Sequence, residues 1–509
     1  MKSKGMVYLV GAGPGDAQLL TVRGAELLHR ADVLVHDARV NPELLRLAPA
    51  SAQILPHPAD TPAAHDKLGE LLIHLAAGGK CVVHLQAGDP FVFGNGGELA
   101  TRLAAAGVAF EVVPGVLPFT TVPNHAGIPL THRAHCSSFT VVTGRPDSSP
   151  AGSDIDCAQL ARAPGTKVLL ADAQHIAPLA ERLVAEGLAP TTPAAVTCHG
   201  TAGSQQTVAG TLADLAAHAS RAGLAGPAVT VIGSVVGLRD RLNWFESRPL
   251  SGRRVVVTRA RDQAAPLTRL LQERGAEVLE VPCIRIAPPT DHQTLVEVIA
   301  GLNAYDWIIF TSANGVTSFF NFFFKAFDDL RDIGGVRLAA VGPATAAKLT
   351  ALHLHVDLTP KDYVGRQIAR DLAAYESLEN RRILVLRAEV ANPELPKLLE
   401  DEGAIVDDVA CYRTIAETDD TNGAAARLAA SGADWVTFTS GSTVEHFHRR
   451  FDLPALLQRF PQLRLATIGP ETTQTLAALK LKPAVEARPH TVEGLAAALE
   501  RAQSRSRKA

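Results

Sequence analysis

Short apolar runs alternate with longer amphipathic stretches along the whole chain. In the first hundred residues, β-branched runs at 7–10, 33–35 and 82–85 are separated by stretches rich in Ala and Leu at 19–30 and 67–77. Strand and helix in alternation predict α/β layering with largely parallel sheets. The alternation continues to the end of the chain, so the same fold class is expected in both halves.

The length of 509 residues is too great for one hydrophobic core, so the chain is expected to divide into domains. The clearest boundary is a stretch with Pro, Ser and Gly at 248–253, which a new apolar run at 255–257 follows. It predicts a first domain at 1–247, a linker at 248–253 and a second domain at 254–502. A softer break at 145–152 predicts two lobes in the first domain, with a small-molecule crevice between them.

The second half contains an internal repeat. The Phe-Thr-Ser segment at 310–316 recurs at 438–444, and the Val-Gly-Pro segment at 341–345 recurs as Ile-Gly-Pro at 468–472. Each Phe-Thr-Ser motif ends a short apolar run that begins with Trp. Two similar α/β lobes are therefore expected in this half.

Each Phe-Thr-Ser segment predicts a strand that runs into a turn and then a helix. The turn places hydroxyl groups and free backbone N–H groups at a helix N-terminus, which favours anions such as carboxylates. Ser312 and Ser440 can also be explained as ordinary N-caps. Four strand-end turns in two matched pairs favour a cleft that binds a polycarboxylate. The candidate substrate-binding residues are Thr311, Ser312, Asn314, Thr345, Ser440, Ser442, Gly469 and Thr472.

Several segments of this half occur together in a known family. In order along the chain, they are at 258–259, 275–278, 306–316, 341–345, 383–387, 411–414, 438–444 and 468–472. In this order and spacing they resemble uroporphyrinogen-III synthases. The resemblance implies two flavodoxin-like lobes joined by a two-stranded connector. It also implies that hydroxymethylbilane is cyclised in the cleft with inversion of the last pyrrole ring, and that this half needs no cofactor.

Tyr412 matches the tyrosine of a Tyr-x-Thr motif in that family. The match implies that Tyr412 assists loss of the substrate hydroxyl, because a phenol can donate a proton to a departing oxygen. A packing tyrosine at a strand end, with one end in water, is the alternative interpretation.

A glycine-rich segment at 10–16 follows the first apolar run. It is not the dinucleotide fingerprint, whose third glycine comes three residues after the second. It predicts a tight turn at which the backbone approaches a ligand closely. Further segments follow at 31–37, 87–94, 113–115, 126–133 and 210–212, and together they resemble uroporphyrinogen-III C-methyltransferases over 7–245.

This second resemblance implies a two-lobed α/β fold that binds S-adenosylmethionine between its lobes. The implied cofactor-binding residues are Gly11, Gly13, Pro14, Gly15, Gly88, Asp89, Pro90, Val92, Phe93, Gly115 and Ala171. Asp37 matches an acidic residue proposed to remove a proton. The alternative for Asp37 is a helix cap in the sequence Asp37-x-x-x-Asn41. The whole chain is thus expected to have a two-lobed tetrapyrrole methyltransferase fold followed by the two flavodoxin-like lobes of a synthase.

Four positions depart from the methyltransferase pattern. Ala87 replaces a glycine, and its methyl group could crowd a backbone position with unusual dihedral angles. Pro56-His57 stands where a basic Val-Gly-Lys stretch is expected. Leu117-Pro118 and Ala171-Asp172 replace residues that contact the cofactor in the family. These changes predict methyl transfer that is weakened, altered or lost.

Composition excludes several other classes of function. The formal net charge of -3 gives no field that would favour nucleic acid or a membrane surface. The six cysteines are scattered singly, without the C-x-x-C pairs of zinc or redox sites, so no metal site is expected. The short first apolar run and the absence of a membrane-length apolar run predict a cytoplasmic protein.

Two main hypotheses of function remain. In the first, one chain makes uroporphyrinogen III and methylates it with S-adenosylmethionine to precorrin-2, in the siroheme or cobalamin branch of tetrapyrrole biosynthesis. In the second, the chain is a monofunctional synthase whose degenerate methyltransferase domain binds tetrapyrrole or dimerises. A more distant class is a nucleotide-dependent oxidoreductase. Family likeness also suggests a homodimer formed through the methyltransferase half.

Overall fold

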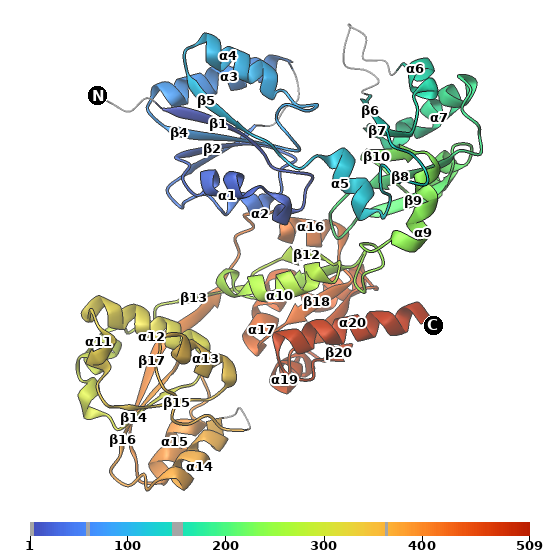
Figure 1. Cartoon of the computed structure of the whole chain (residues 1–509). Helices are drawn as coiled ribbons and strands as arrows, with labels where there is room; N and C mark the ends of the chain where they lie inside the picture. The colour runs from blue at the N-terminus through green and yellow to red at the C-terminus, as the bar shows by residue number, and fades with distance from the viewer. Residues whose placement is uncertain (1–4, 58–61, 145–155, 362–364, 509) are drawn as a thin grey trace.

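The computed structural model describes residues 5–57, 62–144, 156–361 and 365–508. The chain forms four α/β lobes, and each lobe contains a five-stranded sheet (Figure 1). The α/β fold with two lobes in each half is therefore confirmed. None of the helices in these ranges combines the length and apolarity that crossing a membrane requires.

The first lobe is a parallel sheet covered by helices, as the alternating sequence pattern predicts. Its sheet has the order β3-β2-β4-β1-β5. The strands are β1 (Met6–Gly11), β2 (Val33–Asp37), β3 (Gln53–His57), β4 (Cys81–Gln86) and β5 (Ala109–Val113). The helices are α1 (Val22–Leu28), α2 (Pro42–Leu45), α3 (Pro62–Ala77) and α4 (Gly96–Ala105), preceded by the short η1 (Ala17–Leu19).

The second lobe corrects the expectation of largely parallel sheets. In the order β6-β7-β10-β8-β9, β6 and β7 are parallel, whereas β10 is antiparallel to β7 and β8, and β8 is antiparallel to β9. The residues 199–205 between β8 and β9 form turns and no helix, and a hairpin connection of this kind permits only antiparallel pairing. The strands are β6 (Phe139–Thr143), β7 (Thr166–Asp172), β8 (Pro193–Cys198), β9 (Gln206–Thr211) and β10 (Pro227–Ile232). The helices are α5 (Pro118–His125), α6 (Cys157–Arg162), η2 (Ala173–His175), α7 (Ile176–Ala185), α8 (Leu215–Arg221), η3 (Ser234–Leu238) and α9 (Arg239–Leu242).

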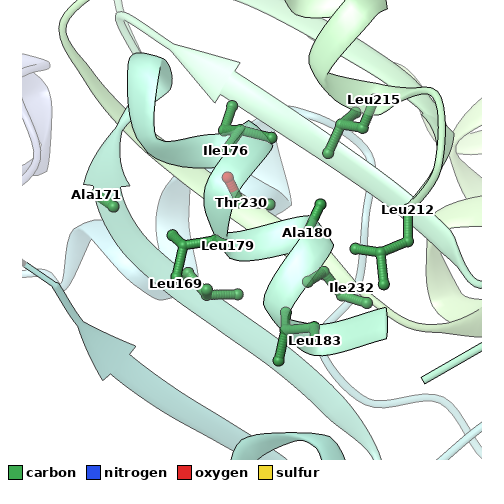
Figure 2. A pocket seen from close by; sticks show the side chains of 10 residues that line it. All are labelled: Leu169, Ala171, Ile176, Leu179, Ala180, Leu183, Leu212, Leu215, Thr230 and Ile232. Carbon is green, nitrogen blue, oxygen red and sulfur yellow. The ribbon is translucent and has the colours of Figure 1, made fainter. Parts of the chain in front are cut away.

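Helix α7 packs on the second sheet through an apolar layer. Figure 2 shows Leu169 of β7 and Ile232 of β10 facing Leu179 and Leu183 of α7. The space left among these side chains is about 10 Å³, which is about the least that holds one water molecule. This layer is hydrophobic core and leaves no room for a ligand.

The third lobe is built from two separated segments of the chain. Its parallel sheet has the order β12-β11-β18-β19-β20. The strands are β11 (Arg254–Val257), β12 (Glu277–Glu280), β18 (Trp435–Phe438), β19 (Arg464–Thr467) and β20 (Val485–Glu486). The helices are α10 (Arg261–Glu273), α16 (Ala424–Ser431), α17 (Gly441–Phe451), α18 (Leu453–Arg459), α19 (Pro470–Ala478) and α20 (Val492–Lys508).

The fourth lobe is inserted between the two segments of the third. Its sheet has the order β13-β17-β16-β14-β15. The strands are β13 (Ile284–Ala287), β14 (Trp307–Phe310), β15 (Arg337–Ala340), β16 (Arg382–Ala388) and β17 (Ile405–Ala416). The helices are α11 (Gln293–Ala300), η4 (Leu302–Ala304), α12 (Ala313–Ala326), η5 (Leu330–Ile333), α13 (Pro343–Ala351), α14 (Gly365–Tyr375) and α15 (Glu394–Asp401). Strands β13 and β17 pair antiparallel and carry the chain between the lobes, as the expected two-stranded connector (Figure 1).

The two predicted Trp-initiated strands lie inside their sheets, each with a strand on both sides. All four residues of β14 and all four residues of β18 are buried. A parallel strand with helices on both faces reads as a continuous apolar run, which explains why both strands were evident in the sequence.

The two halves of the chain are in direct contact. A Cβ on Gly203, in the second lobe, would lie 2.3 Å from the backbone of Ala276 in the third, and the Gly252 amide donates to the Gly203 carbonyl over 3.1 Å. In the first lobe, the Arg46 guanidinium lies 2.6 Å from the Glu280 carboxylate at the end of β12. The residues 248–253 that separate the halves form turns that pack against both of them, and Leu250 among them is fully buried.

Candidate active sites

A cleft of about 740 Å³ lies between the first and second lobes. One wall comes from the loops after β1, β4 and β5, and the other comes from β7, β10 and the loop after β8. This volume is within the usual range of small-molecule sites. Six of the predicted cofactor-binding residues line the cleft: Gly13, Pro14, Gly88, Val92, Phe93 and Ala171. The predicted break at 145–152 lies outside the described residues.

Three glycines allow the loops of the first lobe to meet backbone to backbone. A Cβ on Gly11 would lie 2.5 Å from the Cα of Gly115, and a Cβ on Gly115 would lie 2.0 Å from the carbonyl oxygen of Gly88. Gly88 itself has a φ of +73° and exchanges two backbone hydrogen bonds with Gly13, of 2.8 and 3.2 Å. Gly11 and Gly115 therefore shape the wall of the cleft from behind, since neither of them lines it.

The turn at Gly15 links the two lobes. Gly15 has a φ of +137°, and its carbonyl accepts a 2.8 Å hydrogen bond from the Asn41 side chain. The next residue, Asp16, donates its amide to the Thr201 hydroxyl of the second lobe over 3.2 Å. Gly15 thus belongs to the joint between the lobes.

Asp89 and Pro90 hold the loop after β4 in place. The Asp89 carboxylate accepts from the amides of Phe91 and Gly115, over 2.8 and 2.9 Å, and is 8% exposed. The Pro90 carbonyl accepts from the Gly96 amide where α4 begins. Beyond them, Phe93 is 56% exposed and presents apolar surface to the cleft.

Three of the four departures from the methyltransferase pattern line the cleft. Ala87, Leu117-Pro118 and Ala171-Asp172 all face it. The expected strain at Ala87 is absent, because Ala87 is not among the residues with a positive φ. The cleft measures about 740 Å³ with these side chains in place, so they do not close it. The loops and the volume together fit a ligand of the size of S-adenosylmethionine.

Asp37 ends β2, and its carboxylate is held by Arg39. The carboxylate accepts from the Arg39 amide over 2.9 Å and from the guanidinium over 2.8 Å. Asn41, and not Asp37, caps α2, so the alternative interpretation of Asp37 as that helix cap is wrong. Arg39 lines the cleft and Asp37 does not. On the neighbouring strand β3, His57 pairs in register with Asp37, so the fourth departure lies beside the predicted base.

His84, on the central strand β4 beside β2, was not singled out by sequence reasoning. It is 2% exposed in β4, and its Nδ1 has no hydrogen-bond partner among the described residues. Burial lowers the pKa of His84 to about 4, with a further contribution from His57. The imidazole is therefore neutral at physiological pH.

In the synthase-like half, both Thr-Ser turns contain N-caps. Ser312 accepts from the Gly315 amide over 3.1 Å at the start of α12. Ser440 forms a capping box with Thr443 at the start of α17, and its hydroxyl lies 2.9 Å from that of Ser442. The N-cap interpretation is thus confirmed for both serines. The cap leaves further hydrogen-bonding capacity on each hydroxyl, because a hydroxyl has one donor and two acceptor sites.

Three predicted residues of the fourth lobe meet at one point. The Ser312 hydroxyl lies 3.0 Å from the Tyr412 hydroxyl, and the Asn314 side chain lies close to the same phenol. Burial raises the pKa of Tyr412, which is 7% exposed. Thr311 instead donates to the Leu386 carbonyl over 3.0 Å and so holds the turn against β16.

This cluster is joined to the third lobe by a residue that the sequence did not indicate. Gln263, in the first turns of α10, donates to the Asn314 side chain. The bond brings the turn after β11 against the turn after β14, so the carboxyl ends of the two sheets lie next to each other. No local pattern marks Gln263, because the contact exists only when the two lobes are assembled.

The two Gly-Pro turns present backbone groups. Gly342 and Gly469 are the N-caps of α13 and α19. Because glycine has no side chain, neither cap residue offers a side-chain acceptor to the first amides of its helix. Thr345 and Thr472 follow three residues later and are only 4% and 3% exposed. The turns therefore offer amide N–H groups of a helix N-terminus to an anion, while the threonine side chains lie inside their lobes.

Comparisons with known proteins agree with this division into halves. The family of tetrapyrrole (corrin/porphyrin) methylases matches residues 6–216, and the family of uroporphyrinogen-III synthase HemD matches residues 265–497. A porphyrin biosynthesis protein HemD of Ruminiclostridium josui is 33% identical over 446 residues, which cover 87% of this chain and 88% of that protein.

Two methyltransferases are also similar. A uroporphyrinogen-III C-methyltransferase of Bacillus subtilis is 32% identical over 379 residues, which cover 74% of this chain and 77% of that protein. An S-adenosyl-L-methionine-dependent uroporphyrinogen III methyltransferase of Methanosarcina barkeri is 42% identical over 241 residues, which cover 47% of this chain and 94% of that protein. Both resemblances seen in the sequence are confirmed, and the chain belongs to the fusion proteins of tetrapyrrole biosynthesis that join a tetrapyrrole methylase domain to a uroporphyrinogen-III synthase HemD domain.

Proposed function

We propose that this chain carries out two consecutive reactions. The C-terminal half cyclises hydroxymethylbilane to uroporphyrinogen III with inversion of the last pyrrole ring, and the N-terminal half methylates that product to precorrin-2 with S-adenosylmethionine. The observation that carries the proposal is the convergence of Tyr412, Ser312 and Asn314 beside the turn of the third lobe.

In the synthase half, the chain acts mainly as a template. Backbone amides at the starts of α12, α13, α17 and α19, with the hydroxyls of Ser312 and Ser440, hold the acetate and propionate groups so that the two ends of the substrate meet. Tyr412 is the proton donor. The buried phenol transfers its proton to the departing hydroxyl, which leaves as water, and the cation on the substrate is then attacked by the last pyrrole. The proton released on ring closure returns to Tyr412.

In the methylase half, the cofactor supplies an electrophilic methyl group when it is bound. The backbone at Gly13 and Gly88 and the apolar side chains of Val92 and Phe93 form the cofactor side of the cleft. Asp37 removes a proton from elsewhere on the methylated macrocycle and so neutralises the positive charge that methyl transfer leaves on it. Arg39 lines the cleft with its side chain 59% exposed, so a substrate carboxylate can take over the guanidinium and free Asp37.

The second candidate function is a synthase whose methylase half binds tetrapyrrole or dimerises without methyl transfer. The observation that favours it is the position of Leu117, Pro118 and Ala171 on the cofactor cleft. Incubation with hydroxymethylbilane, with and without S-adenosylmethionine, separates the two candidates. The two-step proposal requires methylated product when the cofactor is added, and uroporphyrinogen III without methylation would favour the second candidate. Absence of ring inversion would contradict both.

We also propose how the chain is organised and where it is located. It divides into domains at 1–247 and 254–502, two chains pair through their methylase halves, and the protein is cytoplasmic. The exposed apolar side chains of Val22 and Phe91, 79% and 57% exposed, support pairing. The free thiols of Cys81, Cys136, Cys198, Cys283 and Cys411 support a reducing compartment. Light scattering of the purified chain tests the pairing, and a mass of one chain would contradict it.

A further inference from the structure

The third and fourth lobes can be aligned residue by residue through their sheets. Strand β18 of the third lobe corresponds to β14 of the fourth, because the repeat aligns Phe438 with Phe310. Beside them, β11 corresponds to β16, since Val257 pairs with Thr437 and Val385 pairs with Ile309. Two residues further on, Arg259 therefore corresponds to Arg387.

The outer neighbours align in the same way. Strand β12 lies beside β11 with Glu280 opposite Val257, and β17 lies beside β16 with Asp408 opposite Val385. Each lobe thus carries an arginine and a carboxylate at equivalent positions near the carboxyl end of its sheet. The pairs are Arg259 with Glu280 and Arg387 with Asp408.

In the fourth lobe, Arg387 and Asp408 form an ion pair. The Arg387 guanidinium donates to both oxygens of the Asp408 carboxylate. The side chains are 18% and 28% exposed. The bidentate bond to Asp408 raises the pKa of Arg387. This arginine is neutralised within its own lobe.

In the third lobe the equivalent residues, Arg259 and Glu280, form no ion pair with each other in the described part of the chain. The Glu280 carboxylate accepts 2.8 Å and 2.6 Å hydrogen bonds from Thr268 of α10 and from Arg46 of the first lobe. In the part of the chain that the structure describes, no carboxylate lies within ion-pair distance of Arg259. Burial lowers the pKa of Arg259, and the charge of Asp262 offsets this only in part. A partly buried guanidinium without a carboxylate partner is costly unless another anion binds it.

Arg259 occupies the turn that faces the reaction site. It lies between β11 and α10, four residues before Gln263, which bonds to Asn314 of the Tyr412 cluster. The strand next to β11 is β18, which leads into the Ser440 turn. A substrate carboxylate bound by the Ser440 turn would therefore lie near Arg259, because the two turns follow adjacent strands.

We infer that Arg259 binds a carboxylate of the substrate in the third lobe, at the position that Asp408 occupies on Arg387 in the fourth. The inference rests on the proposed cyclisation and adds a specific charged contact to it. A planar guanidinium binds a carboxylate with two parallel hydrogen bonds, which fixes the orientation of that end of the substrate. The first lobe contributes indirectly, because its Arg46 forms an ion pair with Glu280 and so keeps Glu280 from pairing with Arg259.

The test compares Arg259→Met and Arg259→Gln with wild type and with Arg387→Met in the full-length chain. Loss of a hydrogen bond to a charged group corresponds to a KM for hydroxymethylbilane raised ~10- to 100-fold, with kcat nearly unchanged. Arg259→Lys is expected to recover part of the affinity. The melting temperature of Arg259→Met should equal or exceed that of wild type, whereas Arg387→Met leaves Asp408 unpaired and should melt at a lower temperature.

The outcomes separate the inference from the proposed function. A wild-type chain without cyclising activity contradicts the proposed function. An active wild type with the same KM in Arg259→Met and Arg259→Gln overturns the inference about Arg259. A lower melting temperature in both variants with an unchanged KM would assign Arg259 a structural role and overturn it as well.

Discussion

Replacement of Tyr412 by Phe removes one oxygen atom from the centre of the synthase site. The variant loses the hydrogen bond between the phenol and Ser312. Ser312 keeps its bond from the Gly315 amide, so the start of α12 remains capped. The loss of stability is therefore expected to be about 1 kcal/mol, the usual net value of one hydrogen bond.

The effect of Tyr412→Phe on catalysis is expected to be much larger than on stability. A positioned proton donor contributes about 10²- to 10⁴-fold to a rate, which corresponds to about 3–5 kcal/mol of activation free energy. Because burial raises the pKa of Tyr412, the phenol stays protonated through neutral and mildly alkaline pH. Wild-type kcat should therefore show no loss from ionisation of this group below pH ~10, the ordinary pKa of tyrosine.

The assay is the rate of uroporphyrinogen III formation from hydroxymethylbilane, with the isomers separated by chromatography. Tyr305→Phe is the matched control. The Tyr305 hydroxyl is in the same lobe and donates a 2.6 Å hydrogen bond to Asp407, and it is not part of the Ser312 turn. Tyr305→Phe should lose stability and keep its kcat. If Tyr412→Phe retained the kcat of wild type, Tyr412 would not be the proton donor and the proposed mechanism would be refuted.

Three further changes test other parts of the molecule. Gly115→Ala places a Cβ 2.0 Å from the Gly88 carbonyl oxygen, so S-adenosylmethionine binding measured by calorimetry should be lost while cyclisation continues; unchanged affinity would contradict this role of the loop contact. The pKa of His84 is about 4 in the folded protein and 6.5 ordinarily, so the free energy of unfolding should fall by up to about 3 kcal/mol as the pH drops from 6.5 to 4. In His84→Leu, the free energy of unfolding measured with urea should depend less on pH over this range. An equal acid slope in His84→Leu would show that another group is responsible. Arg46→Met frees Glu280 to pair with Arg259 and should raise the KM for hydroxymethylbilane. A second change, Glu280→Gln, should restore the KM. An unchanged KM in Arg46→Met would show that Arg46 of the methylase half does not influence the synthase site.

The sequence predicts the strands that lie deep in parallel sheets. The runs beginning at Trp307 and Trp435 were expected as strands, and β14 and β18 have those bounds. Burial on both faces makes such strands apolar along their whole length, so the pattern survives without knowledge of their neighbours. The antiparallel pairing in the second lobe was missed, because strand direction depends on connections that the apolar pattern does not record.

The candidate sites were predicted to different depths. The hydroxyl turns at Ser312 and Ser440 and the phenol of Tyr412 follow motifs within one segment, and the structure brings Ser312 and Tyr412 together. Asp89 and Gly115 were expected at the cofactor, yet they hydrogen-bond to each other behind the cleft. The motif marks residues that the site needs, but it does not distinguish those that touch a ligand from those that shape the wall.

Contacts between halves have no signal in the sequence. Arg46 and Glu280 are 234 residues apart, and each is an ordinary charged residue in its own segment. Their pairing depends on how the two halves are placed, and the close approach of Gly203 to Ala276 is one contact that holds the halves together. Such a pair becomes visible only when the whole chain is assembled.

In the proposed function, one chain both closes and methylates the macrocycle. The most direct measurement supplies hydroxymethylbilane and S-adenosylmethionine with a labelled methyl group to the purified full-length protein and follows the label by mass spectrometry. We expect a ring-closed tetrapyrrole that carries two labelled methyl groups. Tyr412→Phe should suppress its formation, and added uroporphyrinogen III should restore it in that variant. Ring-closed product that never acquires label, with wild-type protein and saturating cofactor, would contradict the proposed pair of reactions.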